Sequence, residues 1–258
     1  MLLGGALTTT ATASLLDVGH LSALTTPGFR RALYQQATAA GFDPDAINAV
    51  IAVESGFNPN IQNAGGAPAL GLLQFWDTFF PDVARRAGQP NVQWDDLRSL
   101  TAEQQVPFVI AYFQGTPIAS KSKPHDAGDY YVATLLPAFV GAPDGTVVGQ
   151  KGSTDTLLNQ SGGSTGLSLG KVYSQNAWLD KNGTGQITVA DIKRPTRSLI
   201  AAAQSLPRVA VDSPGLPAPA STPGAASLLA LAGSVFFCRC CGARQHVVDV
   251  VPDGVTIR

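Results

Sequence analysis

The segment from residue 43 to 59 constrains the fold of this chain more than any other, because it carries both ends of a helix. Asp43 is a favourable N-cap, Pro44 suits the first helical position, and Gly56 suits a left-handed residue at the C-terminal end. The Asn-Pro pair that follows prevents the helix from continuing. The sequence therefore predicts a short helix with Glu54 in its last turn.

Glu54 lies on the apolar side of this expected helix. Ile47, Val50 and Ile51 precede it by seven, four and three residues, so the side chains share one face. Burial beside this aliphatic stripe and the negative end of the helix dipole both disfavour an ionised carboxylate, so we expect a raised pKa for Glu54. A carboxylic acid that keeps its proton near neutral pH suits the cleavage of a glycosidic bond. The alternative is a glutamate that reaches the surface at a helix end.

Several motifs follow one another in a fixed order. Residues 54–59 hold a Glu-Ser dipeptide and a Phe-Asn-Pro turn, and residues 63–75 hold a small-residue loop and a Gly-Leu-Leu-Gln-Phe run. Over residues 26–145 the chain resembles the lytic transglycosylases that share the goose-type lysozyme fold, and phage-encoded members in particular. The order of several motifs makes this resemblance specific, whereas one motif alone would be weak. Further segments of the pattern lie at residues 97–106, 112–113, 129–131 and 135–138.

The resemblance implies that Glu54 is the single catalytic carboxylate and acts first as an acid and then as a base. The C6 hydroxyl of muramic acid would close onto C1 and give a 1,6-anhydro product. The second carboxylate that most glycosidases use is therefore not needed. The resemblance also implies that Ser55 and Gln74 contact the substrate or orient Glu54, and that Gly71 lets the backbone approach the glycan. Turn chemistry alone is the alternative for the glycine.

One segment of the family pattern is missing. Members usually carry an Ala-Tyr-Asn-Ala-Gly-like stretch whose Tyr supports the catalytic Glu, and residues 135–141 take its place here. Tyr131 is our candidate for the supporting role, with helix packing as its alternative. The sequence thus favours an enzyme that cuts the MurNAc-GlcNAc β-1,4 bond of peptidoglycan, as a phage lysin or virion protein. An inactive lysozyme-fold wall-binding or structural virion protein is the alternative.

The expected fold class is mainly α, because no run of residues alternates with period two. The resemblance further implies that the helical domain is lysozyme-like. A chain of 258 residues can bury one core of about 100 to 200 residues with material left over. Helices are expected at residues 27–40, 44–55, 74–87, from 102 onward and at 129–139. The expected divisions are a flexible arm at 1–25, the lysozyme-like domain at 26–205, a Pro/Ala linker at 206–224 and an apolar, Cys-containing tail at 225–258.

Composition and the chain ends limit the partners. A net charge of -1 gives no electrostatic argument for nucleic acid. The apolar run at 225–237 is shorter than the ~18 to 20 residues that span a bilayer, so it would lie at a membrane surface or pack on the domain. Association with a virion or a membrane surface is therefore assigned to the tail. Residues 1–25 lack the features of a clear secretion signal, although the expected place of action is the bacterial cell wall.

A second motif, at residues 180–191, fits an EF-hand loop. We expect Ca²⁺ there in a structural role, with no cofactor required for catalysis. The alternative is a loop that keeps the shape but binds no ion, because position five lacks the commoner Asp and position twelve lacks the longer Glu. The expected ligands are Asp180, Asn182, Thr184, the carbonyl of Gln186 and Asp191.

Overall fold

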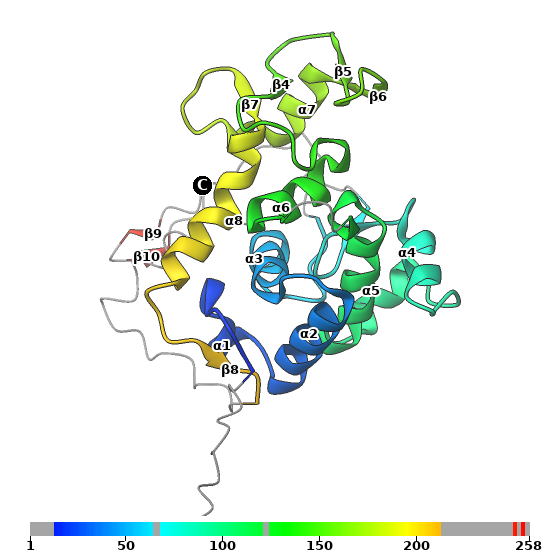
Figure 1. Cartoon of the computed structure of the whole chain (residues 1–258), viewed down its shortest axis with the longest axis vertical. Coiled ribbons are helices and arrows are strands. Elements are labelled where there is room, and N and C mark those ends of the chain that lie inside the picture. Colours follow the sequence, from blue (N-terminus) through cyan, green and yellow to red (C-terminus); the bar gives the residue numbers. More distant parts are fainter. Residues whose placement is uncertain (1–12, 64–67, 121–123, 213–249, 252–253, 256–258) are drawn as a thin grey trace, which may run out of the picture.

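The helix that carries Glu54 lies at the centre of the molecule (Figure 1). This helix, α3 (Pro44–Ser55), packs against α2 (Pro27–Ala40), α6 (Ala127–Leu135) and α8 (Val189–Ala203). α2 in turn packs along α5 (Ala102–Gln114), and α6 packs along α8. Ile47, Val50 and Ile51 are completely buried, so the apolar stripe predicted for α3 is confirmed.

The computed structural model describes residues 13–63, 68–120, 124–212, 250–251 and 254–255. The described chain is mainly helical, as the sequence predicted. None of its helices combines the length and the apolar character needed to cross a bilayer. The remaining helical elements are η1 (Val18–His20), α1 (Leu21–Leu24), α4 (Phe80–Arg86), η2 (Trp94–Ser99), η3 (Pro117–Ala119), η4 (Pro137–Phe139), α7 (Leu169–Asn176) and η5 (Ala177–Leu179). The strands near the two ends of the chain are β1 (Ser14–Leu15), β8 (Val209–Ala210), β9 (Val250–Val251) and β10 (Gly254–Val255).

The predicted helix boundaries around α3 are confirmed by the capping contacts. The Asp43 carboxylate accepts hydrogen bonds from the backbone N–H of Asp45 at 2.9 Å and of Ala46 at 3.3 Å. Gly56 ends the helix with a φ of 55°, and Gly41 ends α2 with a φ of 77°. Such left-handed conformations favour glycine, because they crowd a Cβ atom.

Two expected divisions of the chain need correction. Residues 14–24, assigned to a flexible arm, form β1, η1 and α1, and they bury Leu15, Val18 and Leu21 in the core. β1 pairs antiparallel with β8, which falls inside the expected linker. The sequence suggested an arm because these elements are too short to give a periodic signal. Most of the expected linker and tail lies outside the described residues.

The helix expected at 74–87 begins later than predicted. The structure places a two-stranded hairpin first, with β2 (Ala69–Leu70) antiparallel to β3 (Phe75–Trp76), and α4 starts at Phe80. Gln74 has a φ of 51°, a left-handed conformation that no helix interior tolerates. The aromatic residues after Gln74 suggested a helix, but the left-handed turn at Gln74 prevents a helix from running through this position.

Residues 147–188 form a distal lobe that stands away from the helical body at the top of Figure 1. β4 (Val147–Gln150) pairs with β7 (Gln186–Thr188), and β5 (Thr156–Leu158) pairs with β6 (Ser164–Ser168), both antiparallel. α7 packs on β4 at Gly149, where a Cβ would lie 3.1 Å from the backbone nitrogen of Tyr173. The sequence did not predict these strands, because both ribbons shift register and neither alternates cleanly.

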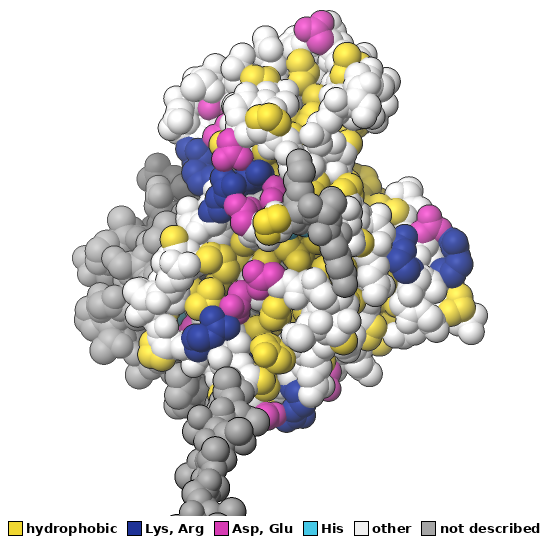
Figure 2. Space-filling view, viewed as in Figure 1, with side chains coloured by type: hydrophobic (Ala, Val, Ile, Leu, Met, Phe, Trp, Pro, Cys, Tyr) yellow, Lys and Arg dark blue, Asp and Glu magenta, His cyan; other side chains and the backbone are white. Residues whose placement is uncertain are grey.

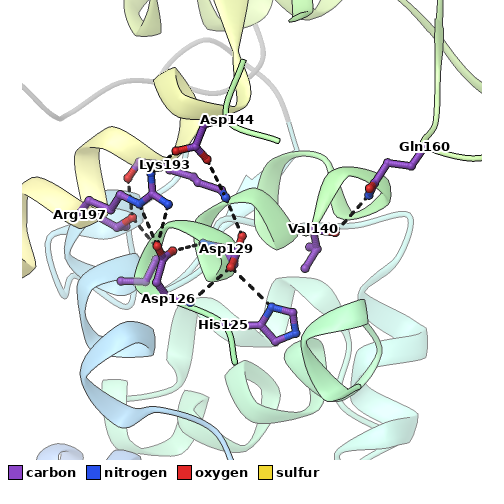
Figure 3. Close-up of polar contacts among 10 residues, drawn as sticks. His125, Asp126, Asp129, Val140, Asp144, Gln160, Lys193 and Arg197 are labelled. Carbon is purple, nitrogen blue, oxygen red and sulfur yellow. Dashed lines mark hydrogen bonds and ion pairs between the residues drawn. The ribbon is translucent and has the colours of Figure 1, made fainter. Parts of the chain in front are cut away.

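A network of charged side chains, the α6–α8 network, connects α8 to α6 and to the segment that leads into the distal lobe (Figure 3). Lys193 is only 5% exposed, and its Nζ lies 2.9 Å from Asp129 and 3.0 Å from Asp144. Arg197 bridges Asp126 and Asp144 at 2.7 and 2.8 Å. Hydrogen bonds from Arg197 and Lys193 hold the pKa of Asp144 below its usual value. Figure 2 shows basic and acidic side chains lying side by side below the distal lobe.

Candidate active site

Glu54 sits half-buried in the last turn of α3. One of its carboxyl oxygens, Oε1, is shielded from solvent, whereas the residue as a whole is partly exposed. The side chain therefore lies at the boundary between the apolar core and the surface. This position combines partial desolvation with access for a ligand, which is what a general acid needs.

The backbone turns sharply after Glu54. Gly56 and Phe57 both have left-handed conformations, with φ of 55° and 66°. Phe57 is 3% exposed and packs edge-on against Phe29 at 6.1 Å between ring centroids, so the core holds this unusual backbone in place. The Asn58 side chain then accepts a hydrogen bond from the N–H of Asn60 at 3.0 Å. A rigid turn therefore fixes the end of the helix that carries the carboxylate.

Ser55 and Gln74 both donate to backbone carbonyls in this structure. Ser55 is buried, and its hydroxyl donates to the carbonyl of Ile51 at 3.0 Å. The Gln74 amide donates from Nε2 to the carbonyls of Ile61 and Gly71, at 3.0 and 3.1 Å. Ser55 is therefore bonded within α3, whereas Gln74 holds the backbone at Ile61 and Gly71. Their predicted contacts with substrate stay predictions.

Gln105 clamps the loop between α3 and the β2–β3 hairpin, a role that the sequence did not reveal. It is completely buried on α5. Its Oε1 accepts from the N–H of Leu72 at 3.0 Å, and its Nε2 donates to the carbonyls of Pro59 and Leu97 at 2.8 and 2.9 Å. A Cβ at Gly71, where φ is 83°, would lie 2.6 Å from the Gln105 Oε1. Gly71 is therefore required by both its conformation and this close contact.

The tyrosine pair on α6 divides between two environments. The Tyr130 hydroxyl accepts a hydrogen bond from the N–H of Asp43 at 2.9 Å, at the opposite end of α3 from Glu54. Burial raises the pKa of Tyr130, which keeps its hydroxyl neutral. Tyr131 is buried on the same helix, which packs against α3. Its proposed support of Glu54 stays a prediction.

Three of the expected calcium ligands converge in the distal lobe. The Thr184 hydroxyl lies 3.1 Å from Asp180 Oδ1 and 3.3 Å from the carbonyl of Gln186. Asp191 instead accepts from Thr188 N–H at 2.8 Å and pairs with an arginine on α8. In the described part of the chain, no three His, Cys, Asp or Glu side chains cluster to hold a metal. A cation in this loop would therefore depend on hydroxyl, amide and carbonyl oxygens beside its two carboxylates.

Four of the predicted active-site residues fall within a recognised family domain. Residues 32–101 match the family model of the transglycosylase SLT domain, and this stretch includes Glu54, Ser55, Gly71 and Gln74. No curated protein matches the chain significantly. Members of the matched family are peptidoglycan lytic transglycosylases. The chain therefore carries a transglycosylase SLT domain and is an enzyme of the peptidoglycan lytic transglycosylase type.

Proposed function

We propose that Glu54 is the general acid and base that cuts the MurNAc-GlcNAc β-1,4 bond of peptidoglycan. The observation that carries this proposal is its half-buried position at the end of α3, within the matched domain. The three aliphatic side chains that precede it on the same face are completely buried. The helix C-terminus adds a negative potential, which further favours the protonated acid.

The reaction needs only this one carboxyl group. Glu54 first gives its proton to the glycosidic oxygen, so the C1–O4 bond breaks and the GlcNAc hydroxyl leaves. The resulting carboxylate then takes the proton of the muramic acid C6 hydroxyl, and the C6 oxygen bonds to C1. Glu54 recovers its proton and the product carries a 1,6-anhydro ring. We assign to Ser55 and Gln74 a contact with the substrate or the orientation of Glu54, and to Gly71 a close approach of the backbone to the glycan. Tyr131 is assigned the support of Glu54.

Replacement of Glu54 by Gln tests the assignment, because the amide is nearly isosteric and has no acidic proton to transfer. General acid–base assistance is worth ~10² to 10⁴ in rate, so release of muropeptides from purified cell walls should fall by about that factor. Glu103→Gln is the matched control, because Glu103 is exposed and is the chain's other glutamate. Near-normal release by Glu54→Gln would refute the assignment. Wild-type protein that binds walls without releasing muropeptides would instead support an inactive wall-binding or structural virion protein, which the missing family segment favours.

The product separates a lyase from a hydrolase. Mass spectrometry of the digested walls should find muropeptides lighter by one water than those from a hydrolase, because the C6 hydroxyl takes the place of water. Reducing-end muramic acid as the sole product would show that water reaches C1.

We further propose that the loop at 180–191 binds Ca²⁺ as a structural ion. The convergence of the Asp180, Thr184 and Gln186 oxygens supports this assignment. Asp191 would have to exchange its present hydrogen bonds for the ion. Association with a virion or a membrane surface is a separate proposal that rests on residues 225–258, almost all of which lie outside the described residues.

A further inference from the structure

A cleft of about 570 Å³ separates the helical body from the distal lobe. One wall comes from β3, α4 and α5, the end of α6 lies between the walls, and α7 forms the opposite wall. Its volume lies within the range of about 300 to 1,000 Å³ that is typical of ligand sites. The α7 wall lies outside the matched residues 32–101, so the family domain supplies only part of the cleft.

The wall on the helical body is aromatic. Trp76, Phe79 and Tyr112 line it, and the rings of Phe79 and Tyr112 lie 5.9 Å apart in a tilted arrangement. Phe79 is 36% exposed and is one of the few large apolar side chains on the described surface. Exposed rings with polar neighbours are typical of sites that bind ligands with both apolar faces and hydroxyl groups.

The α7 wall is basic and polar. Lys171 lines the cleft, and its ammonium group forms no ion pair with any described residue. Asp82 also lines the cleft but is already paired with Arg85, so it does not neutralise the lysine. Arg86 adds a second positive charge on the facing wall. The lining therefore favours an anionic group of the ligand.

Asn176 lies at the end of α7 and forms part of the same wall. It is 8% exposed and lines the cleft. Its Nδ2 donates to the carbonyl of Val172 at 3.0 Å, whereas its buried Oδ1 accepts no hydrogen bond from a described residue. This oxygen is shielded from solvent, so Asn176 shapes the wall of the cleft and is assigned no contact with the ligand.

We propose that this cleft binds the substituent of a muramyl unit, with Lys171 as the residue that selects it through a carboxylate. The proposal rests on the peptidoglycan-cleaving function and deepens it. Each muramyl unit carries a lactyl group, which ends either in a free carboxylate or in a peptide with carboxylates of its own. The aromatic wall would pack on the sugar ring, and the Lys171 ammonium would pair with the carboxylate. α7 is thus a specificity element that the distal lobe adds to the catalytic domain.

Lys171→Glu tests the proposal by charge reversal. Lys171 is exposed, so the variant should fold with an unchanged melting temperature. Kinetics would be measured on soluble glycan strands that carry peptides and on strands from which an amidase has removed them. We expect KM to rise about tenfold with kcat nearly unchanged, because the residue binds the substrate away from the reacting bond. The wild-type KM should also rise with salt more steeply than that of Lys171→Ala. Lys151→Glu is the matched control, because it reverses an exposed charge elsewhere in the distal lobe.

The two kinds of strand identify the source of the carboxylate. A defect on peptide-bearing strands alone would assign the carboxylate to the peptide, and a defect on stripped strands alone would assign it to the free lactyl group. A defect on both would show that the site accepts either carboxylate. Kinetics of Lys171→Glu equal to those of Lys151→Glu on both strands would overturn the proposal. That result with an active wild type and an inactive Glu54→Gln would leave the proposed catalytic function intact. An inactive wild type would instead refute that function.

Discussion

Replacement of Gln105 by Ala should strongly lower the free energy of unfolding of the protein. The side chain is completely buried, and it bonds the Leu72 N–H and the carbonyls of Pro59 and Leu97. Truncation leaves these three backbone groups without their partner. Each buried group left unsatisfied costs about 1 to 3 kcal/mol, and water entering the space reduces this, so we expect a total loss of about 3 to 5 kcal/mol.

Thermal and urea unfolding would measure the loss. For a domain of this size each kcal/mol lowers the Tm by about 2 to 4 °C, so the expected decrease is about 6 to 20 °C. Gln114→Ala is the matched control on the same helix, because Gln114 is exposed and should change stability by less than about 0.5 kcal/mol. Muropeptide release should also fall for Gln105→Ala, since the clamped loop follows the Glu54 helix directly.

Gln105→Glu separates hydrogen bonding from volume. At neutral pH its carboxylate would still accept from Leu72 but would face two carbonyl oxygens, so we expect a loss of stability at least as large as that of the Ala variant. Acidification should recover part of the stability, because a protonated Glu donates one hydrogen bond. A loss below about 1 kcal/mol for Gln105→Ala would refute the reasoning, because it would mean that the three backbone groups find other partners at little cost.

Three further predictions concern calcium, acid stability and backbone conformation. Calcium at a hundredfold excess over its Kd should stabilise the wild type by about 2.7 kcal/mol. Asp180→Ala should abolish the difference between melting curves measured with calcium and with chelator. Identical curves for the wild type would refute an ion in this loop. Asp144→Asn should lower stability at neutral pH, because the pKa of Asp144 is held low by the two basic side chains of the α6–α8 network and the folded state therefore favours the carboxylate. This contribution is complete above the pKa that Asp144 has in the unfolded state, and it is lost as pH falls through the pKa that it has in the folded state. The difference in stability between wild type and variant should therefore close below about pH 4. A difference that persists there would contradict this role of the Asp144 carboxylate. Gly71→Ala should lower the Tm more than Gly88→Ala, since both glycines have positive φ but only at Gly71 would a Cβ meet the Gln105 side chain; equal decreases would show that the backbone conformation alone matters.

Local signals in the sequence predicted the centre of the fold well. Asp43 and Gly56 defined α3, and the aliphatic spacing on its face placed Glu54 at the edge of the core. These signals succeed because a cap and a periodic stripe act within a few residues of one another. The sequence did not predict the hairpin before α4. Gln74 has a left-handed backbone there, and glutamine usually avoids that conformation, so the residue type gives no sign of the turn.

Contacts between residues that are far apart in the sequence could not be predicted from the sequence. Lys193 pairs with Asp129 and Asp144 only because α8 packs along α6, and nothing local to a lysine reveals such a neighbour. The Gln105 clamp is of the same kind, since its partners come from three separate segments. The expected ligand Asp191 shows the opposite limit, because the motif predicts which oxygens are present but not how they are oriented.

The β1–β8 pairing brings the two ends of the described core to one place on the molecule. The N–H of Val211 donates to the carbonyl of Ala13 at 3.0 Å, and Arg31 pairs with Asp212 beside them. Because the chain enters and leaves at the same end of this ribbon, a pull between the two ends would break its hydrogen bonds one after another rather than all together. The same closeness means that a short peptide joining residues 13 and 212 would close the core into a ring. New ends could then be opened at the exposed turn around Gly152 without separating α3 from the helices that hold Glu54.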